Sequence, residues 1–275
     1  MNFKLAVLLL FAGTSISIAQ NTLYHTETEG IYREGLDLLD KSNYAGAREM
    51  FERYIESDGT KANLVEAQYY LSISALTLYH EDGEKLIEDF ITENKTHPKA
   101  VLAYYELGNY YFQQKSYTKA IEYYEKVNQT LITSEERAET RYKLGYSYFT
   151  KRNFNEALKK FNLLKREKDV YGYASAYYAG YIEYENGEYD KAINDLERAR
   201  QSESYAAIVP GMLANLYYKQ GRYDDLITYS EAVLKGSRRV NAQDFYLLTA
   251  DAYLNKGDNV KAAEYYGLYS AQIKK

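Results

Sequence analysis

Tyrosine is the residue that offers the most chemistry in this sequence, because 34 of the 275 residues are tyrosine. The residues that enzymes commonly use are scarce: the chain has no cysteine, no G-x-S-x-G motif for a nucleophilic serine, and only three histidines, His25, His80 and His97. These histidines do not stand in a metal-binding spacing such as H-E-x-x-H. We therefore expect no enzymatic activity, no catalytic residues, no metal site and no cofactor.

Charged residues give no stronger signal for catalysis or for nucleic-acid binding. Acidic pairs such as Glu81-Asp82 and Asp224-Asp225 are more typical of solvated turns than of acid–base sites, because adjacent helical positions point apart. The formal net charge is −5, and the densest basic run, residues 165–169, contains both signs and is predicted to form a solvated turn. A nucleic-acid partner requires a basic stripe, so we expect no nucleic acid among the partners.

Glycine and alanine recur at a fixed distance, which indicates repeated helix pairs. Four glycines each precede an alanine by 12 residues: Gly35 and Ala47, Gly108 and Ala120, Gly145 and Ala157, Gly180 and Ala192. Glycine inside a helix costs about 0.5–1 kcal/mol relative to alanine, so its recurrence indicates close approach between paired helices.

This pattern resembles the tetratricopeptide repeat (TPR) family, whose unit is a helix-turn-helix of about 34 residues. The signature positions are filled best by Tyr104, Leu107, Gly108, Tyr111, Ala120 and Tyr124. The resemblance implies an all-α fold, a right-handed α-solenoid of about seven TPR-like helix-turn-helix units. The first helices are predicted to begin near Thr28, Ala67, Val101, Ala138, Tyr173, Ala207 and Gln243. The second and sixth units depart from the pattern, with Ser74 and Ala214 in place of the glycine.

The N-terminus has the pattern of a secretory signal. Lys4 is followed by an apolar run from Leu5 to Ala12, and small residues precede a predicted cleavage between Ala19 and Gln20. We predict a signal peptide over residues 1–19, an N-terminal segment over 20–27 and a TPR array over 28–275. A membrane anchor is the alternative, although polar residues interrupt the segment. Residues 57–63 and 128–135 are predicted joints, because they are longer than the other inter-unit stretches.

The absence of cysteine bears on location, because the chain can form no disulfide and carries no cysteine for lipid attachment. We therefore predict an exported protein of the bacterial periplasm or envelope, with no integral membrane span in the mature chain.

A partner-binding surface is predicted on the first helices, whose residues line the concave face of such arrays. In phase with the signature, the predicted partner-binding residues are Tyr105, Asn109, Phe112, Tyr142, Tyr146, Tyr177, Tyr181, Tyr184, Asn215 and Tyr218, and Tyr32 and Asp251 lie in the same phase. Tyrosine combines broad apolar contact with a polar tip, and asparagine can bind a peptide backbone. The predicted ligand is a protein or peptide. The other interpretation is that these tyrosines pack against neighbouring first helices.

The predicted function is a non-enzymatic periplasmic scaffold in cell-envelope assembly, since residues 51–127 resemble the repeat arrays of outer-membrane assembly and cell-division proteins. Two alternatives are an oligomerising structural subunit of an envelope or secretion machine, and a carbohydrate-binding module whose tyrosines stack on sugar rings. The last predicted helix carries Tyr265, Tyr266 and Leu268, and no polar closing helix follows it. We expect self-association through the C-terminal repeat, cover by a partner, or a natural protein that continues beyond Lys275.

Overall fold

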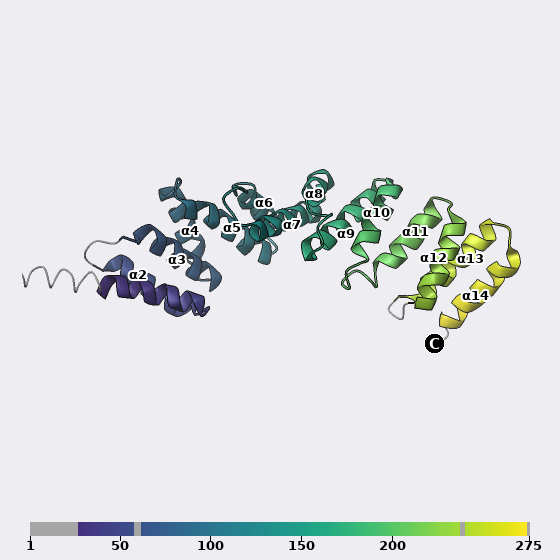
Figure 1. Ribbon diagram of the computed structural model, residues 1–275, viewed down its shortest axis with the longest axis horizontal. Coiled ribbons are helices and arrows are strands. Elements are labelled where there is room, and N and C mark those ends of the chain that lie inside the picture. The colour runs from purple at the N-terminus through teal and green to yellow at the C-terminus, as the bar shows by residue number, and fades with distance from the viewer. Residues whose placement is uncertain (1–26, 58–61, 237–239, 274–275) are drawn as a thin grey trace, which may run out of the picture. The chain divides into compact units, whose positions relative to one another are not determined.

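The computed structural model describes residues 27–57, 62–236 and 240–273, and all regular structure within them is α-helical. The predicted signal peptide lies outside these residues. The described helices form seven consecutive pairs (Figure 1). The first helices are residues 27–40, α3 (Leu64–Thr77), α5 (Pro98–Gln113), α7 (Ser134–Thr150), α9 (Val170–Glu185), α11 (Val209–Lys219) and α13 (Ala242–Asn255). The second helices are α2 (Tyr44–Glu56), α4 (Gly83–Glu93), α6 (Tyr117–Tyr124), α8 (Phe154–Phe161), α10 (Tyr189–Ala199), α12 (Tyr223–Gly236) and α14 (Asn259–Ile273).

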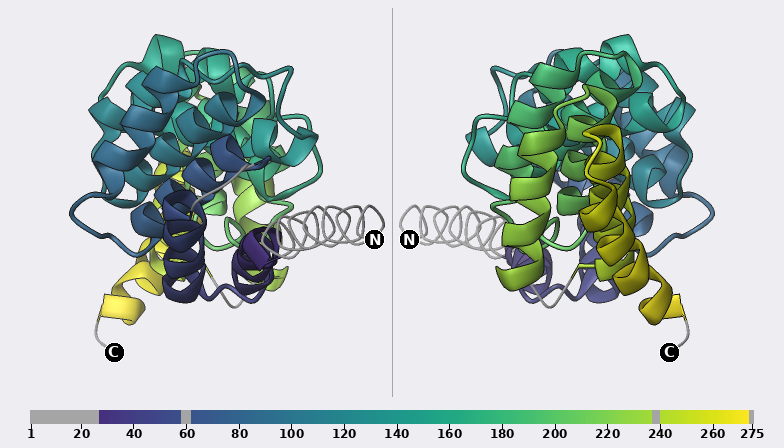
Figure 2. Two further views of the ribbon diagram at one scale, coloured as in Figure 1. Left: turned by 90° about the vertical axis from the view of Figure 1, so that its left-hand side faces the viewer. Right: turned by 90° about the vertical axis from the view of Figure 1, so that its right-hand side faces the viewer.

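The chain divides into two compact units between Thr133 and Ser134, inside one of the two predicted joints. Within each unit, consecutive helices pack against one another, and three first helices also contact the next first helix: α3 contacts α5, α7 contacts α9, and α11 contacts α13. In the second unit α13 and α14 lie side by side (Figure 2, right). From α3 onward, the predicted first-helix starts fall within four residues of those observed.

The recurring glycines lie where the two helices of a pair approach most closely, as the sequence predicts. A Cβ atom on Gly108 would lie 2.4 Å from the ring of Tyr124, a buried residue of the second helix of the same pair. On Gly145 it would lie 2.9 Å from Phe161, and on Gly180 2.8 Å from Leu196. In the second pair, where Ser74 replaces the glycine, a second-helix glycine lies at the contact: a Cβ atom on Gly83 would lie 2.9 Å from the Leu76 backbone.

Each pair has one turn residue with a positive φ angle between its two helices. Gly187, Gly221 and Gly257 hold this position in three pairs, whereas Ser42, Tyr79, Lys115 and Arg152 hold it in the other four. Left-handed backbone suits glycine because a Cβ atom meets the following carbonyl group there, at a cost of about 1–2 kcal/mol. The turn is therefore set by the packing of the helices, and the residue type adapts to it.

Candidate functional site

Aromatic rings pack against one another across α7 and α9 in the second unit. We call this set the aromatic array: Tyr142, Tyr146, Phe149, Tyr177, Tyr178, Tyr181 and Tyr205. Tyr178 is central, with its ring centroid 4.9 Å from that of Phe149 and 5.3 Å from that of Tyr146. Tyr177 stacks on Tyr205 at 4.6 Å. The array joins two neighbouring first helices and the connection between α10 and α11.

Four predicted partner-binding residues, Tyr142, Tyr146, Tyr177 and Tyr181, belong to the aromatic array, and each is half-buried. Their rings pack against neighbouring rings and still leave part of each side chain at the surface. Burial, followed by the nearby Tyr205 and Tyr146, raises the pKa of Tyr142 far above its usual value. Its hydroxyl therefore stays protonated and can donate a hydrogen bond at physiological pH.

The other predicted residues of the second unit lie further along its first helices. Tyr184 packs against Tyr189, and the ammonium of Lys219 lies 4.7 Å above the Tyr184 ring. Tyr218 packs edge-on against Tyr223, with ring centroids 5.9 Å apart. Asn215 is exposed, and its side-chain amide donates to the Gly211 carbonyl at 2.9 Å. Asp251 accepts a hydrogen bond from the Tyr266 hydroxyl.

In the first unit, the predicted residues differ in exposure. Tyr105 is buried, and Phe112 packs edge-on against Tyr117 with centroids 5.8 Å apart. Tyr32 is buried and donates from its hydroxyl to Glu66 at 2.7 Å. Asn109 accepts a hydrogen bond from the Tyr124 hydroxyl at 2.8 Å.

Asn109 also lines a pocket of about 130 Å³ between the end of α3 and α5. The pocket is lined by Leu76, Thr77, Tyr79, Glu106, Asn109, Tyr110 and Gln113.

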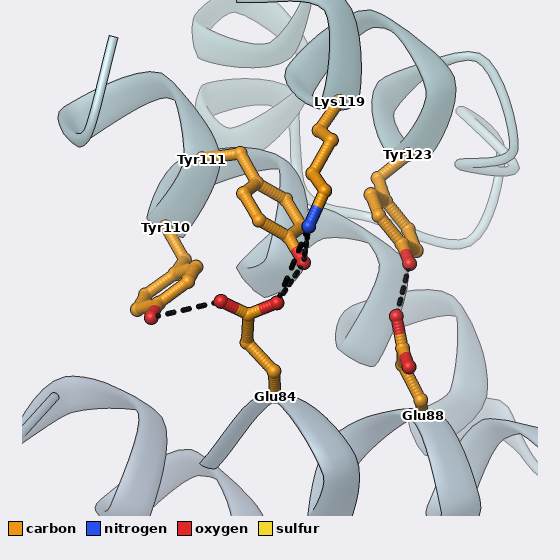
Figure 3. Close-up of polar contacts among 6 residues, drawn as sticks. All are labelled: Glu84, Glu88, Tyr110, Tyr111, Lys119 and Tyr123. Atoms are coloured by element: carbon orange, nitrogen blue, oxygen red, sulfur yellow. Dashed lines mark hydrogen bonds and ion pairs between the residues drawn. The ribbon is translucent and has the colours of Figure 1, made fainter. Parts of the chain in front are cut away.

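Tyrosine hydroxyls converge on two carboxylates of α4 (Figure 3). Glu84 accepts hydrogen bonds from Tyr110 at 3.2 Å and from Tyr111, and it forms an ion pair with Lys119 at 3.4 Å. Glu88 accepts from Tyr123 at 2.5 Å. The Tyr111 hydrogen bond is the main reason that the pKa of Glu84 is lowered, with the Lys119 charge adding to it. These carboxylates join the second pair to the third.

This cluster was not predicted from the sequence, although the residue spacing contains a signal for it. Glu88 and Tyr123 are 35 residues apart, and the pairs Tyr32–Glu66 and Glu231–Tyr265 are each 34 apart. A tyrosine and a glutamate one repeat length apart therefore meet across neighbouring pairs.

A buried charge cluster in the second unit was also missed. Lys165 binds Asp195 of α10 at 2.5 Å and Glu183 of α9 at 3.3 Å, and the three side chains are only 18%, 13% and 3% exposed. Burial, then the charge of Asp195, raises the pKa of Glu183 to about 7, while Lys165 opposes this shift. The predicted solvated turn at residues 165–169 is thus wrong at its first residue, since Lys165 lies inward, whereas residues 166–169 are exposed.

Neither a metal site nor a membrane-spanning helix is found among the described residues. No group of three or more histidine, aspartate or glutamate side chains among them is placed to hold a metal ion. None of the helices that the structure describes combines the length and apolar character needed to cross a membrane.

The chain belongs to the tetratricopeptide repeat family. That family matches residues 80–129, 142–206 and 212–272, which together make up more than half of the sequence. The repeat array is a scaffold for protein–protein interaction. A comparison with curated proteins gave no match.

Solved structures of repeat proteins share the fold at low sequence identity. A tetratricopeptide repeat protein from Parabacteroides merdae ATCC 43184 is 16% identical, with a TM-score of 0.51 over 90% of this chain and 93% of that chain. MamA AMB-1 is 17% identical, with a TM-score of 0.53 over 67% of this chain and 96% of that chain. YrrB, described as a TPR protein with an unusual peptide-binding site, is 19% identical, with a TM-score of 0.50 over 65% and 88% of the two chains. At these identities the likeness extends to the fold alone.

Proposed function

We propose that this protein is a non-enzymatic scaffold of the bacterial cell envelope, which holds an extended segment of a partner protein against the aromatic array. The observation that carries this proposal is the row of half-buried tyrosines on α7 and α9. Because these rings are already held by one another, the side chains of the array lose little further conformational entropy when a partner binds to them. The peptide-binding site described for YrrB supports a peptide ligand by analogy.

Site-specific photo-crosslinking tests this proposal without disturbing the packing of the array. The photoreactive residue p-benzoylphenylalanine retains an aromatic ring, so it can replace Tyr146 or Tyr181. Matched controls are Lys159 of α8 and Lys191 of α10, which are exposed on second helices. We expect irradiation of intact cells to yield a discrete crosslinked partner from the two array positions only. Equal crosslinking from the second-helix controls would contradict the proposal.

Export is the second part of the proposal, and it rests on the signal pattern that ends at Ala19. We propose that the mature protein begins at Gln20 and functions in the periplasm. Intact-mass measurement of protein from a periplasmic fraction tests this. A mass that retains residues 1–19 would contradict cleavage at this position.

An oligomerising role is a second candidate, and the surface of α14 favours it. Val260, Leu268 and Ile273 of this helix are all exposed apolar residues. In the preceding pair, α12 is covered by α13, so a first helix from a second copy could cover α14 in the same way. We expect light scattering to report a dimer that the double substitution Leu268→Glu and Ile273→Glu dissociates. The control substitution is Val170→Glu, at an exposed apolar position of α9.

A further inference from the structure

The seven members of the aromatic array are all partly exposed, so together they present a surface of rings in the second unit. Two of these rings, Tyr177 and Tyr205, stack with centroids 4.6 Å apart and an interplanar angle of 19°. Phe149 and Tyr181 meet edge to face, with centroids 5.6 Å apart and an interplanar angle of 76°. Ring faces and ring edges are therefore both held in place before a partner binds.

The electrostatic surroundings of the array differ from those of the tyrosines in the first unit. Burial, followed by a neighbouring tyrosine, raises the pKa values of Tyr177 and Tyr205. In the first unit, burial followed by a hydrogen bond to a glutamate raises the pKa values of Tyr111 and Tyr123. The hydroxyls of Tyr177 and Tyr205 thus stay protonated at physiological pH among other rings, away from the carboxylates that hold the first-unit tyrosines.

The array offers hydrogen-bond donors more than acceptors. Its members carry hydroxyl groups, and none of the seven carries a carboxylate or a side-chain amide. An ordinary extended peptide has an N–H group at nearly every residue, and burial of such a group without an acceptor is unfavourable. Proline has no N–H group but keeps its carbonyl oxygen. A proline-rich segment therefore matches a surface of rings and hydroxyl donors.

The spacing of the rings also suits the polyproline II conformation. This helix rises about 3.1 Å per residue, so residues two positions apart are separated by about 6 Å along its axis. The ring centroids of Tyr142 and Tyr146, which lie one turn apart on α7, are separated by 6.3 Å. Two rings of α7 can therefore contact two prolines of one segment. Because this conformation already exists in the free peptide, little conformational entropy is lost on binding.

We propose that the partner segment held by the aromatic array is rich in proline and binds as a polyproline II helix. The proposal rests on the function proposed above and specifies the chemistry of its ligand. The pyrrolidine rings pack against the tyrosine rings, and the hydroxyls of Tyr177 and Tyr205 donate to carbonyl oxygens of the segment. Because no member of the array is charged, binding should depend little on salt, unlike recognition of an acidic or basic peptide.

Removal of two hydroxyl groups separates binding from folding. The double variant Tyr177→Phe with Tyr205→Phe keeps both rings and loses both donors. The matched control is Tyr217→Phe with Tyr229→Phe, because these two tyrosines are also partly exposed and pack ring against ring at 5.6 Å, outside the array. Circular dichroism checks that both double variants are folded.

The probe is fluorescein-labelled octaproline, and its binding to the purified protein is followed by fluorescence anisotropy. A labelled glycine-serine peptide of the same length is the composition control, and an unlabelled cello-oligosaccharide is the competitor. We expect octaproline to bind with little change between low and high salt, and about tenfold more weakly to the Tyr177 and Tyr205 double variant. The Tyr217 and Tyr229 control is expected to bind as the unaltered protein does.

Equal binding of octaproline and the glycine-serine peptide would refute recognition of proline, and so would undiminished binding by the Tyr177 and Tyr205 double variant. Displacement of octaproline by the oligosaccharide at similar concentrations would assign the array to sugars instead. If octaproline does not bind, the proposal is wrong even where crosslinking from Tyr146 and Tyr181 captures a partner. The proposed function would then stand with a segment of another composition, because the crosslinking is measured separately.

Discussion

The third and fifth helix pairs use the same two positions in opposite ways. Gly108 and Gly180 mark corresponding points of α5 and α9, which aligns Tyr111 with Glu183 and Tyr123 with Asp195. In the third pair the two tyrosines donate hydrogen bonds to carboxylates of α4. In the fifth pair the two carboxylates accept from Lys165, which follows α8. The contact between neighbouring pairs is thus polar in both places, with donor and acceptor exchanged.

This exchange also changes the balance of charge. Glu84 is partly exposed and has three donors, so its pKa is lowered and it stays ionised. Glu183 is buried and shares one lysine with Asp195, so its pKa is raised. Tyrosine hydroxyls join neighbouring pairs without adding charge, whereas two carboxylates and one lysine leave an excess of negative charge in a buried site. We expect the two contacts to respond differently to substitution and to pH.

Removal of the lysine should have the largest effect and should distinguish the two contacts most clearly. Lys165→Met leaves Glu183 and Asp195 buried without their cation, and loss of one partner from such a site typically costs about 3–5 kcal/mol. Lys119→Met acts on a side chain that is 53% exposed, where an ion pair contributes about 1 kcal/mol or less. Urea unfolding at pH 8 measures both free energies. Equal losses would contradict the comparison.

Removal of one hydroxyl group should weaken the third-pair contact. Tyr111→Phe keeps the buried ring but removes a hydrogen bond to the charged Glu84, and such bonds contribute about 1.5–3 kcal/mol. We expect the lower part of this range, because the side chain of Glu84 is partly exposed. Thermal unfolding followed by circular dichroism measures the loss. An unchanged melting temperature would mean that the ring alone holds this contact.

A fall in pH should increase the stability that the Glu183 contact contributes and decrease the stability that the Glu84 contact contributes. Glu183 has a folded-state pKa of about 7 against 4.5 for an ordinary glutamate, so the folded state binds the proton more tightly. Its contribution is fully present below the unfolded-state pKa and is lost as pH rises through 7. Between pH 6 and pH 8 this loss is about 1.4 kcal/mol, or tenfold in the folding equilibrium.

Glu183→Gln should remove this dependence, and unfolding free energies at pH 6, 7 and 8 measure it. For Glu84 the sign is reversed: a lowered pKa gives stability that is present at neutral pH and is lost as pH falls through the folded-state pKa. A Glu183→Gln variant whose stability still falls between pH 6 and pH 8 would assign the dependence to another group.

The smallest effect is expected in the aromatic array. Tyr178→Phe leaves every ring contact in place and removes only the hydroxyl, from a ring that packs against Tyr142 and Phe149. We expect a loss of about 1 kcal/mol or less by urea unfolding. If Tyr178→Phe loses more unfolding free energy than Tyr111→Phe, the hydroxyl groups and not the ring contacts provide most of the stability of the array.

The sequence was sufficient to predict the helix pairs but not the contacts between them. The spacing of Gly108 and Ala120 predicts a close approach of two helices, because backbone proximity restricts residue size at both positions. The tyrosines of the first helices were placed on the right elements. The residues that these tyrosines contact were not predicted. A tyrosine of a first helix can pack its ring against a ring of the next first helix, or it can donate its hydroxyl to a carboxylate, and a single sequence does not specify which of the two occurs.

Lys165 shows why charged residues were the hardest to place. A mixed run of charges is usually solvated, and four of its five residues are exposed. The informative residue was its partner: Glu183 stands at the position that Tyr111, Tyr148 and Tyr253 hold in other pairs. A carboxylate at a buried aromatic position requires a cation or a proton, and Lys165 lies 18 residues earlier in the chain.

The left-handed turn inside each pair offers a route to greater heat tolerance. Ser42, Lys115 and Arg152 hold a position that glycine holds in three other pairs, and each lies in a short connection between two helices of its own pair. In repeat proteins the stability of the array is approximately a sum over units and their nearest neighbours. Glycine could therefore be introduced at one turn at a time, and the small gains would add along the array while the proposed binding surfaces keep their side chains.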